Sequence, residues 1–200
     1  MASSVVQIAN LALAHLGQFR LVSVSANDSN EARWVNELYP HARDYVTEQP
    51  GIIWRHAKRT QALEETTNDR DDDFDYAYSR PSDCFSFRYM LPADGPFDPR
   101  YPIRFECEGD VIYADEATAR GVYVRQITDV TKFVPSFTDA VAWYLAHLLC
   151  VPLRMENGLI ATTLQGYGRA LNHAVACGAA EQMAYIKTAD EAQPDWLTGR

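Results

Sequence analysis

SNEARWVNELYPHARDYV (residues 29–46) carries the clearest secondary-structure pattern in this chain. Its apolar side chains recur every three or four residues, so they fall on one side of an α-helix, with most of the charged side chains elsewhere around it. The apolar stripe consists of Ala32, Val35, Tyr39, Ala42 and Val46. Asp28 or Ser29 provides an N-cap, and Pro40 predicts a kink because proline removes a backbone donor. The segment therefore predicts an amphipathic helix.

Three other segments show helical periodicity. The first begins after Ser3 or Ser4 and runs to about Leu16, where Gly17 stops it. Another opens at Pro135 and ends near Pro152; its inward side chains are predicted to be Phe137, Val141, Leu145, Leu148 and Leu149. The last runs over about 159–186, with a predicted inward stripe of Ile160, Leu164, Tyr167, Leu171 and Val175. Gly166, Gly168 and Gly178 weaken this last helix or mark places where another backbone approaches closely.

Between these helices the periodicity changes from helical to strand-like. Phe85, Phe87 and Tyr89 alternate with polar or small side chains, which is typical of a half-buried strand. Residues 58–65 and 121–127 are predicted strands, and 103–107 with 111–114 predict a hairpin around Glu-Gly-Asp. Residues 66–75 form a polar loop, and the four prolines in 91–102 predict a turn-rich segment.

These elements predict an α+β fold in one domain. We expect a bundle of about four helices, formed by residues 1–57 and 135–186, with a β-rich insertion over 58–134. A polar segment, 187–200, follows as an extended C-terminal arm. The amino terminus lacks the basic region of a signal peptide, and the longest charge-free apolar run, 140–153, is too short to span a bilayer.

The charge of the chain bears on its partners. Eighteen basic and 27 acidic residues give a formal net charge of −9. Proteins that grip nucleic acid neutralise phosphates with clustered lysine and arginine, so this balance disfavours a nucleic-acid binder. It leaves open a conduit that DNA passes without sticking, because a negative wall repels phosphate.

No metal or cofactor site is predicted. An EF-hand loop numbered from Asp71 would need glycine at the sixth position and glutamate at the twelfth, where Tyr76 and Ser82 stand. The five histidines show no metal-binding spacing; His147 and His173 lie on apolar helices and are expected to be hydrogen-bonded interior or interface side chains. The four cysteines form no C-x-x-C pair and are expected to be buried small hydrophobes.

No catalytic constellation stands out either. The chain lacks a G-x-S-x-G motif, and no cysteine has a local nucleophile signature. Glu106, Glu108 and Asp110 could form a glycosidase-type carboxylate pair, although a solvated hairpin face explains them better. We therefore expect no enzyme activity.

Several stretches in chain order are similar to one known family. They are IANLALAHLG (8–17), SNEAR (29–33), Trp54, YSRPSDC (78–84) and DWLTGR (195–200). Together they resemble the head-to-tail adaptor proteins of tailed bacteriophages, also called tail tubular protein A or the portal-docking adaptor of short-tailed phages. The polar loop and the proline-rich segment match least.

The resemblance implies a structural virion protein without a cofactor. Such adaptors form a ring, twelvefold in this family, below the portal; they extend the DNA channel and present a platform to the tail nozzle or tube. In the family the C-terminal arm reaches the portal, so Trp196, Leu197 and Arg200 are the candidate portal contacts. The expected location is the neck of the virion, after synthesis in the host cytoplasm.

Trp196 supports docking independently of the resemblance. A lone indole on a polar arm usually seeks a partner pocket, unless it folds back on its own domain. Two other functions stay open at this point. A virion-associated cell-wall hydrolase would need a paired acid and base in a cleft. A small-ligand-binding host protein would be a monomer with an enclosed apolar pocket.

Overall fold

The computed structural model describes residues 4–24, 29–95 and 100–190, with side chains described as far as Cys177. Within them the chain is mixed α+β, with four α-helices and two antiparallel sheets, which confirms the predicted α+β class. The chain divides into two compact units. The helical unit combines the chain up to Ala42 with the chain from Val134 onward, and the β unit is formed by Arg43–Phe133.

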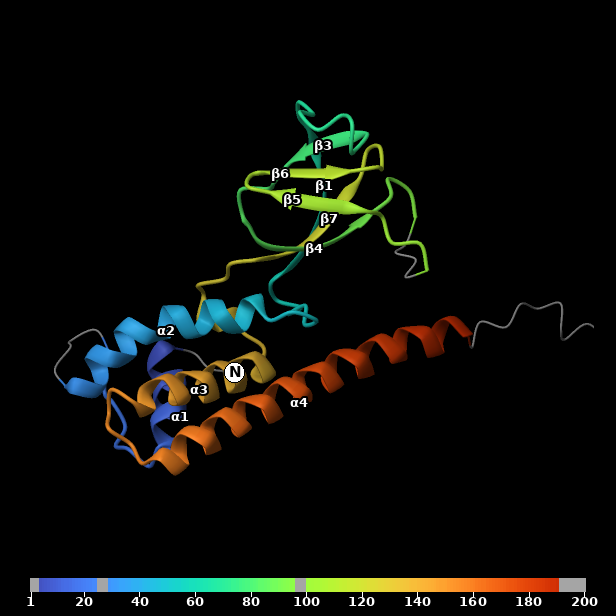
Figure 1. Ribbon diagram of the computed structural model, residues 1–200. Helices are drawn as coiled ribbons and strands as arrows, with labels where there is room; N and C mark the ends of the chain where they lie inside the picture. Colours follow the sequence, from blue (N-terminus) through green and yellow to red (C-terminus); the bar gives the residue numbers. More distant parts are fainter. Residues whose placement is uncertain (1–3, 25–28, 96–99, 191–200) are drawn as a thin grey trace, which may run out of the picture. The chain divides into compact units, whose positions relative to one another are not determined.

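The four helices have the bounds α1 Val5–His15, α2 Asn30–Glu48, α3 Pro135–Cys150 and α4 Asn157–Asp190 (Figure 1). The predicted caps are present. The Ser4 hydroxyl accepts from the backbone N–H of Gln7 at 3.4 Å, and the Ser29 hydroxyl accepts from that of Ala32 at 3.1 Å. Pro135 occupies the first position of α3, where its missing N–H costs nothing. Sequence and structure thus agree on where these helices begin.

The helical unit is built on α3, which packs against α1 on one side and α4 on another. The predicted inward residues of α2 are all buried, and so are Phe137, Val141, Leu145 and Leu149 of α3. Burial of each of the Val, Leu and Phe side chains among them stabilises the fold by about 1.5–3 kcal/mol. Apart from Val46, which belongs to the β unit, these residues are part of the buried core of the helical unit.

An aromatic stack joins α1, α3 and α4. The rings of His15 and Trp143 lie 3.6 Å apart at 11° to one another. A Cβ added to Gly166 of α4 would meet the Trp143 ring at 2.3 Å, so only glycine fits there. The predicted close approach at Gly166 is therefore real, but the neighbour is an indole ring and not a backbone. At Gly168 an added Cβ would meet nothing within 4 Å.

The predicted inward stripe of α4 is wrong at two positions. Leu164 and Val175 are 51% and 50% exposed, whereas the buried side chains of α4 are Thr163, Tyr167, Ala170 and Ala174, next to the buried Gly166. One cause is the Trp143 ring, which an added Cβ at Gly166 would meet at 2.3 Å, so this position on the buried side of α4 has no room for a side chain. The helix is therefore rotated away from the orientation that its large apolar residues suggest.

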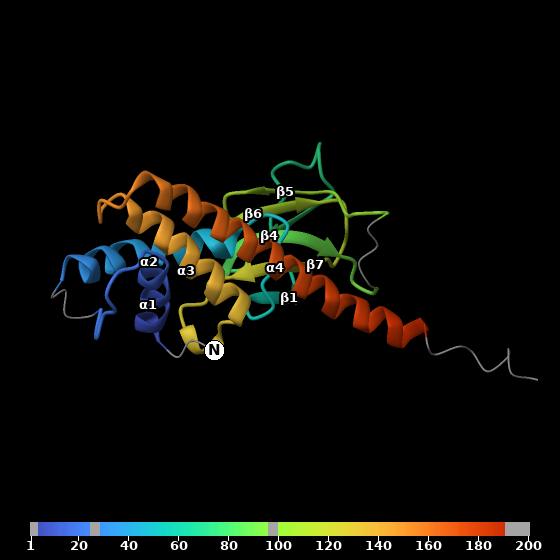
Figure 2. The same cartoon turned by 90° about the horizontal axis from the view of Figure 1, so that it is seen from below.

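α4 is much longer than its partner helix. Its 34 residues correspond to roughly 51 Å, against roughly 24 Å for the 16 residues of α3. Figures 1 and 2 both show α4 continuing past the end of α3. The predicted helix over 159–186 is confirmed, and the observed helix is a few residues longer at each end.

The β unit holds two antiparallel sheets in the orders β1-β7-β4 and β2-β3-β6-β5. The strands have the bounds β1 Lys58–Ala62, β2 Glu64–Glu65, β3 Tyr76–Ser79, β4 Cys84–Leu91, β5 Phe105–Glu108, β6 Val111–Ala114 and β7 Arg120–Arg125. The predicted hairpin is confirmed, with Gly109 at φ +56° in its turn. β3 was not predicted as a strand because it is only four residues long and follows the polar loop directly.

The two sheets share one core because the chain passes from one to the other at Leu63. This buried residue separates β1 from β2, and its N–H donates to the Ala119 carbonyl at 3.0 Å. Around it lie Tyr78, Met90 and Ile112, which come from both sheets. The Tyr78 hydroxyl donates to the Glu116 carbonyl, so the buried phenol has a partner. The segment predicted as one strand, 58–65, thus serves two sheets.

The end of α2 is fixed within the β unit. The guanidinium of Arg88, from β4, donates to the carbonyls of Glu48 and Gln49 at 3.0 and 3.1 Å. A cation is favourable at a helix C-terminus, where carbonyls lack intrahelical partners. The indole N–H of the buried Trp54 donates to the Val46 carbonyl at 2.8 Å. Both contacts explain why residues 43–57 belong with the strands.

Candidate docking surface

The first candidate surface begins where α1 ends. Gly17 has φ +67°, which lets the chain close a Schellman turn: the Gln18 N–H donates to the Leu13 carbonyl at 2.9 Å and the Gly17 N–H to the Ala14 carbonyl at 3.1 Å. The chain then leaves the helix in a set direction. Residues 18–24, which follow this turn, are called the pinned loop below.

Side chains from three parts of the helical unit hold the pinned loop. The Asn10 amide both donates to the Leu21 carbonyl, at 3.0 Å, and accepts from the Leu21 N–H, at 2.7 Å. The Asn36 amide of α2 donates to the Val24 carbonyl. The Gln18 amide contacts the Met155 sulfur at 3.5 Å, just before α4. The loop is therefore fixed near its beginning, middle and end.

This fixed backbone presents two apolar side chains to solvent. Phe19 is 95% exposed and Val22 is 93% exposed. Single exposed apolar residues are common on protein surfaces, but two on one preorganised loop lose little entropy when a partner covers them. The geometry suits a docking element.

The second candidate surface is the outward side of α4. Leu164 and Val175 are about half exposed, and Gly168 and the partly buried Leu171 lie between them. At 100° per residue these four positions form one stripe along the helix. We call them the outer stripe.

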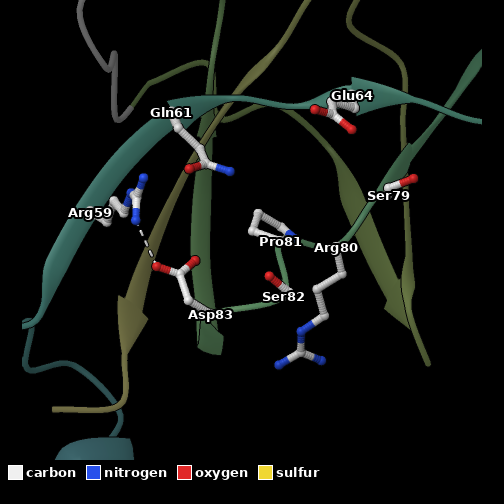
Figure 3. A pocket seen from close by; sticks show the side chains of 8 residues that line it. All are labelled: Arg59, Gln61, Glu64, Ser79, Arg80, Pro81, Ser82 and Asp83. Carbon is white, nitrogen blue, oxygen red and sulfur yellow. Dashed lines mark hydrogen bonds and ion pairs between the residues drawn. The ribbon is translucent and has the colours of Figure 1, made fainter.

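A polar cavity of about 560 Å³ lies beside β1, β2 and the β3–β4 turn (Figure 3). Three of its four charged groups, Arg59, Arg80 and Asp83, have partners within the chain. Arg59 pairs with Asp83 at 2.8 Å, and Asp83 also accepts from the Tyr123 hydroxyl at 2.6 Å. The Tyr123 hydrogen bond, together with Arg59, lowers the pKa of Asp83. Arg80 donates to the Phe85 carbonyl at 3.0 Å. Hydrogen bonds and ion pairs within the chain therefore already engage Arg59, Arg80 and Asp83.

Arg70 locks the polar loop onto the β5–β6 hairpin. Its guanidinium pairs with Asp73, Glu106 and Glu108 at 3.1, 3.2 and 3.4 Å, and it lies over the Tyr113 ring at 5.1 Å. Hydrogen bonds to Glu106 and Asp73 raise the pKa of Arg70. Glu106 and Glu108 thus share one arginine on an exposed surface, which explains these carboxylates as partners of Arg70.

The negative charge of the chain is concentrated on the four-stranded sheet and its loops. Residues 64–80 and 104–116 contain twelve carboxylates and three arginines, a balance equal to the net charge of −9 of the whole chain. The remaining residues are balanced in charge. Because β2 and most of β5 are exposed, carboxylates such as Glu64, Glu65 and Glu106 face solvent. This sheet therefore repels phosphate.

The histidines and cysteines only partly meet expectation. His147 lies 3.5 Å from the Thr163 hydroxyl, and the exposed His173 lies 3.6 Å from the Cys177 sulfur. Cys150 is buried, but Cys107 and Cys177 are exposed, so the prediction of buried cysteines is wrong for these two. Among the residues that the structure describes, no three or more His, Cys, Asp or Glu gather to hold a metal ion.

The predicted portal contacts Trp196, Leu197 and Arg200 lie outside the described residues. The docking features found instead are Phe19, Val22 and the outer stripe. Phe19 and Val22 are visible in the sequence as apolar residues, but the sequence pattern does not show that Asn10 and Asn36 hold this segment with those side chains outward. The amide side chains at those two positions are the signal that could have suggested it.

Searches of protein-family models and of curated proteins found no match to this chain. Within the described part of the chain, no helix combines the length and the apolar character needed to cross a bilayer.

Proposed function

We propose that this chain is a structural virion protein, a head-to-tail adaptor that forms a ring between the portal and the tail nozzle or tube of a bacteriophage. The subunits bind the portal through the helical unit and the C-terminal arm, and they offer the β unit to the next tail component. The ring extends the DNA channel, and the protein acts by docking and not by chemistry.

The pinned loop carries this proposal. Phe19 and Val22 are almost fully exposed on one loop, whose backbone is held by Asn10 and Asn36 and whose Gln18 contacts Met155. A rigid apolar loop of this kind suits a protein whose task is assembly. The assignment to the adaptor family rests on the order of the motifs along the sequence, from residues 8–17 to 195–200.

The finer architecture belongs to the same proposal. The helical unit forms the body of the adaptor, residues 58–134 form its β-rich insertion, and residues 187–200 form the arm that reaches the portal. Trp196 and Leu197 are the apolar anchors of the arm, and Arg200 is its cationic end. Interfaces of this kind depend on a few buried aromatic anchors.

The charge distribution supports the role of a conduit. The four-stranded sheet and its loops carry a charge balance equal to the net charge of −9 of the whole chain, and the carboxylates on β2 and β5 are exposed. A surface of this sign does not retain DNA that moves past it.

The test is native mass spectrometry of this protein alone and mixed with the portal ring encoded in the same genome. We expect a discrete complex of several copies on the portal ring, twelve by analogy with the family. A portal of an unrelated phage is the matched control and should bind no copies.

A protein that stays unbound in both mixtures would overturn the proposal. Clearing of purified peptidoglycan in a zymogram would favour the hydrolase function instead. The two experiments together separate an assembly protein from an enzyme.

A further inference from the structure

Two apolar surfaces of the helical unit are left uncovered by the residues that the structure describes. One is the pinned loop, with Phe19 95% and Val22 93% exposed; the other is the outer stripe, with Leu164 51% and Val175 50% exposed. These exposures show that the two surfaces do not cover each other within one chain.

The outer stripe has the shape of a receptor for a projecting side chain. Gly168 lies between Leu164 and Leu171 on the same side of α4, and an added Cβ at Gly168 would meet nothing within 4 Å. The missing side chain leaves open space between the two leucines of the stripe. Phe19 on the pinned loop projects almost fully into solvent and is a suitable side chain to fill it.

The charge around the outer stripe permits two copies to approach. From Asn157 to Cys177, α4 has no Asp or Glu and a single arginine, Arg169. At 100° per residue, Arg169 lies more than 120° around the helix from the middle of the stripe. The flanking positions Ala161, Gln165 and Asn172 are uncharged. Although each copy has a net charge of −9, this face contributes none of the repulsion.

We propose that the outer stripe of one copy receives the pinned loop of a second copy of this chain, with Phe19 seated over Gly168. The contact joins two different surfaces of the same unit, so each copy uses both and continues the chain of contacts until it closes as a ring. This deepens the proposed function and rests on it for the closure of the ring. A contact between identical surfaces, α4 on α4, would stop at a dimer and leave Phe19 uncovered.

The pairwise contact is expected to be weak. Five or six side chains are far fewer than the roughly 20–30 residues a side of a stable interface. We therefore expect a dissociation constant on the order of 0.1–1 mM for two free copies. A ring would gain strength from many such contacts on a common template.

A mixed disulfide experiment tests which surfaces meet. Val22→Cys is introduced in one copy and Leu164→Cys in another of different mass, both with Cys107 and Cys177 replaced by serine. Mild oxidation of the mixture should link the two species to each other. The matched control is Thr162→Cys, an exposed position on the same turn of α4 that faces away from the stripe; its cross-linking with Val22→Cys should be at least tenfold lower.

Sedimentation velocity up to about 1 mM tests what holds the copies together. Phe19→Ser should weaken association at least tenfold without changing the fold, because Phe19 contacts almost nothing in its own chain. Gly168→Gln should also weaken association while raising the melting temperature, since glycine is a poor helix former and the site is open. Gly158→Ala, equally open at the start of α4, should leave association unchanged.

Three results would overturn the inference. In the first, the wild-type protein stays monomeric at every concentration and the Val22→Cys and Leu164→Cys copies do not cross-link. In the second, association survives Phe19→Ser or Gly168→Gln. In the third, Thr162→Cys cross-links with Val22→Cys as strongly as Leu164→Cys does. These are distinct from failure of the adaptor function. If the protein associates with itself through these surfaces but does not bind the portal, only the adaptor function is removed. If the Phe19→Ser variant forms rings on the portal like those of the wild-type protein, only this inference is removed.

Discussion

The amide of Asn10 and the peptide backbone of Leu21 exchange two hydrogen bonds, as two paired strand residues would. A side chain in α1 thus acts as a short stretch of partner strand for a loop eleven residues later. Because one amide supplies both a donor and an acceptor, the orientation of the Leu21 peptide is fixed. The direction of the exposed side chains on either side of Leu21 follows from this pairing.

Asn10→Ala is expected to lower the free energy of unfolding by about 1–3 kcal/mol, because two partly buried backbone groups of Leu21 lose their partners. Hydrogen exchange of the Leu21 N–H should accelerate more than that of the α3 core. Asn172→Ala, at an exposed position of α4, is the control and should change stability by less than about 0.5 kcal/mol. Unchanged exchange at Leu21 would show that Asn10 does not hold the loop.

Gly166→Ala should destabilise the helical unit by about 1–3 kcal/mol, since the new methyl group would lie 2.3 Å from the Trp143 ring and force it to move. Chemical denaturation monitored by tryptophan fluorescence measures the change. In Gly158→Ala, also on α4, the methyl group meets open space, and the higher helix propensity of alanine should leave stability equal or higher. Equal effects of the two substitutions would contradict the stacking arrangement.

His56 predicts a pH dependence for the β unit. Its ring lies 5.4 Å from that of Phe133, and burial lowers its pKa to about 4 from the ordinary 6.5. Between these values the unfolded chain binds the proton and the folded chain does not. Stability is therefore complete above pH 6.5 and falls as the pH drops toward 4.

The loss from His56 is expected to be about 1–2 kcal/mol, less than full conversion of the pKa change, because the ring is partly exposed. His56→Gln cannot titrate, so the stability difference between wild type and variant should itself change over this range. The carboxylates are common to both proteins and cancel in that difference. A constant difference between pH 7 and 4 would contradict the prediction.

Arg70→Gln should loosen the polar loop, because the guanidinium links Asp73 to Glu106 and Glu108. Hydrogen exchange at the amides of residues 66–75 should accelerate, and the wild-type protein should show part of the same effect at high salt. Arg59→Gln, which breaks the exposed pair with Asp83 elsewhere in the β unit, is the control and should leave these amides unchanged.

Deletion of residues 190–200 should abolish portal binding and leave the melting temperature unchanged. The physical reason is that Trp196 and Leu197 are the proposed anchors, while all the core residues found in the structure precede Cys177. Pull-down with the portal ring measures binding. Replacement of Trp196 alone by alanine should have most of the effect, and full binding by the truncated chain would remove the arm from the interface.

Local pattern predicted the helices well, because capping and periodicity act within a few residues. Ser29 as a cap and the buried stripe from Ala32 to Val46 follow directly from the sequence. The facing side of α4 could not be predicted, since it depends on the size of Trp143 in another helix. Rules based on hydrophobicity selected Leu164 and Val175, which are half exposed, whereas Ala170 and Ala174 are buried and Gly166 lies against the Trp143 ring.

The candidate surface was harder to predict than the fold. An apolar residue is by default expected to be buried. The exposure of Phe19 and Val22 depends on the contacts of Asn10 and Asn36, which the sequence does not reveal. Likewise, four residues such as β3 Tyr76–Ser79 become a strand through pairing with β6, which is a long-range effect. Periodicity within a segment does not contain that information.

The passage of the chain at Leu63 has a consequence for how the β unit comes apart. A single residue belongs to the boundary of both sheets, and its side chain lies in their common core. Neither sheet can separate from the other without exposing Leu63 and breaking its bond to Ala119. The seven strands should therefore open as one cooperative unit, with a single exchange free energy for the amides of Val122 in one sheet and Ile112 in the other.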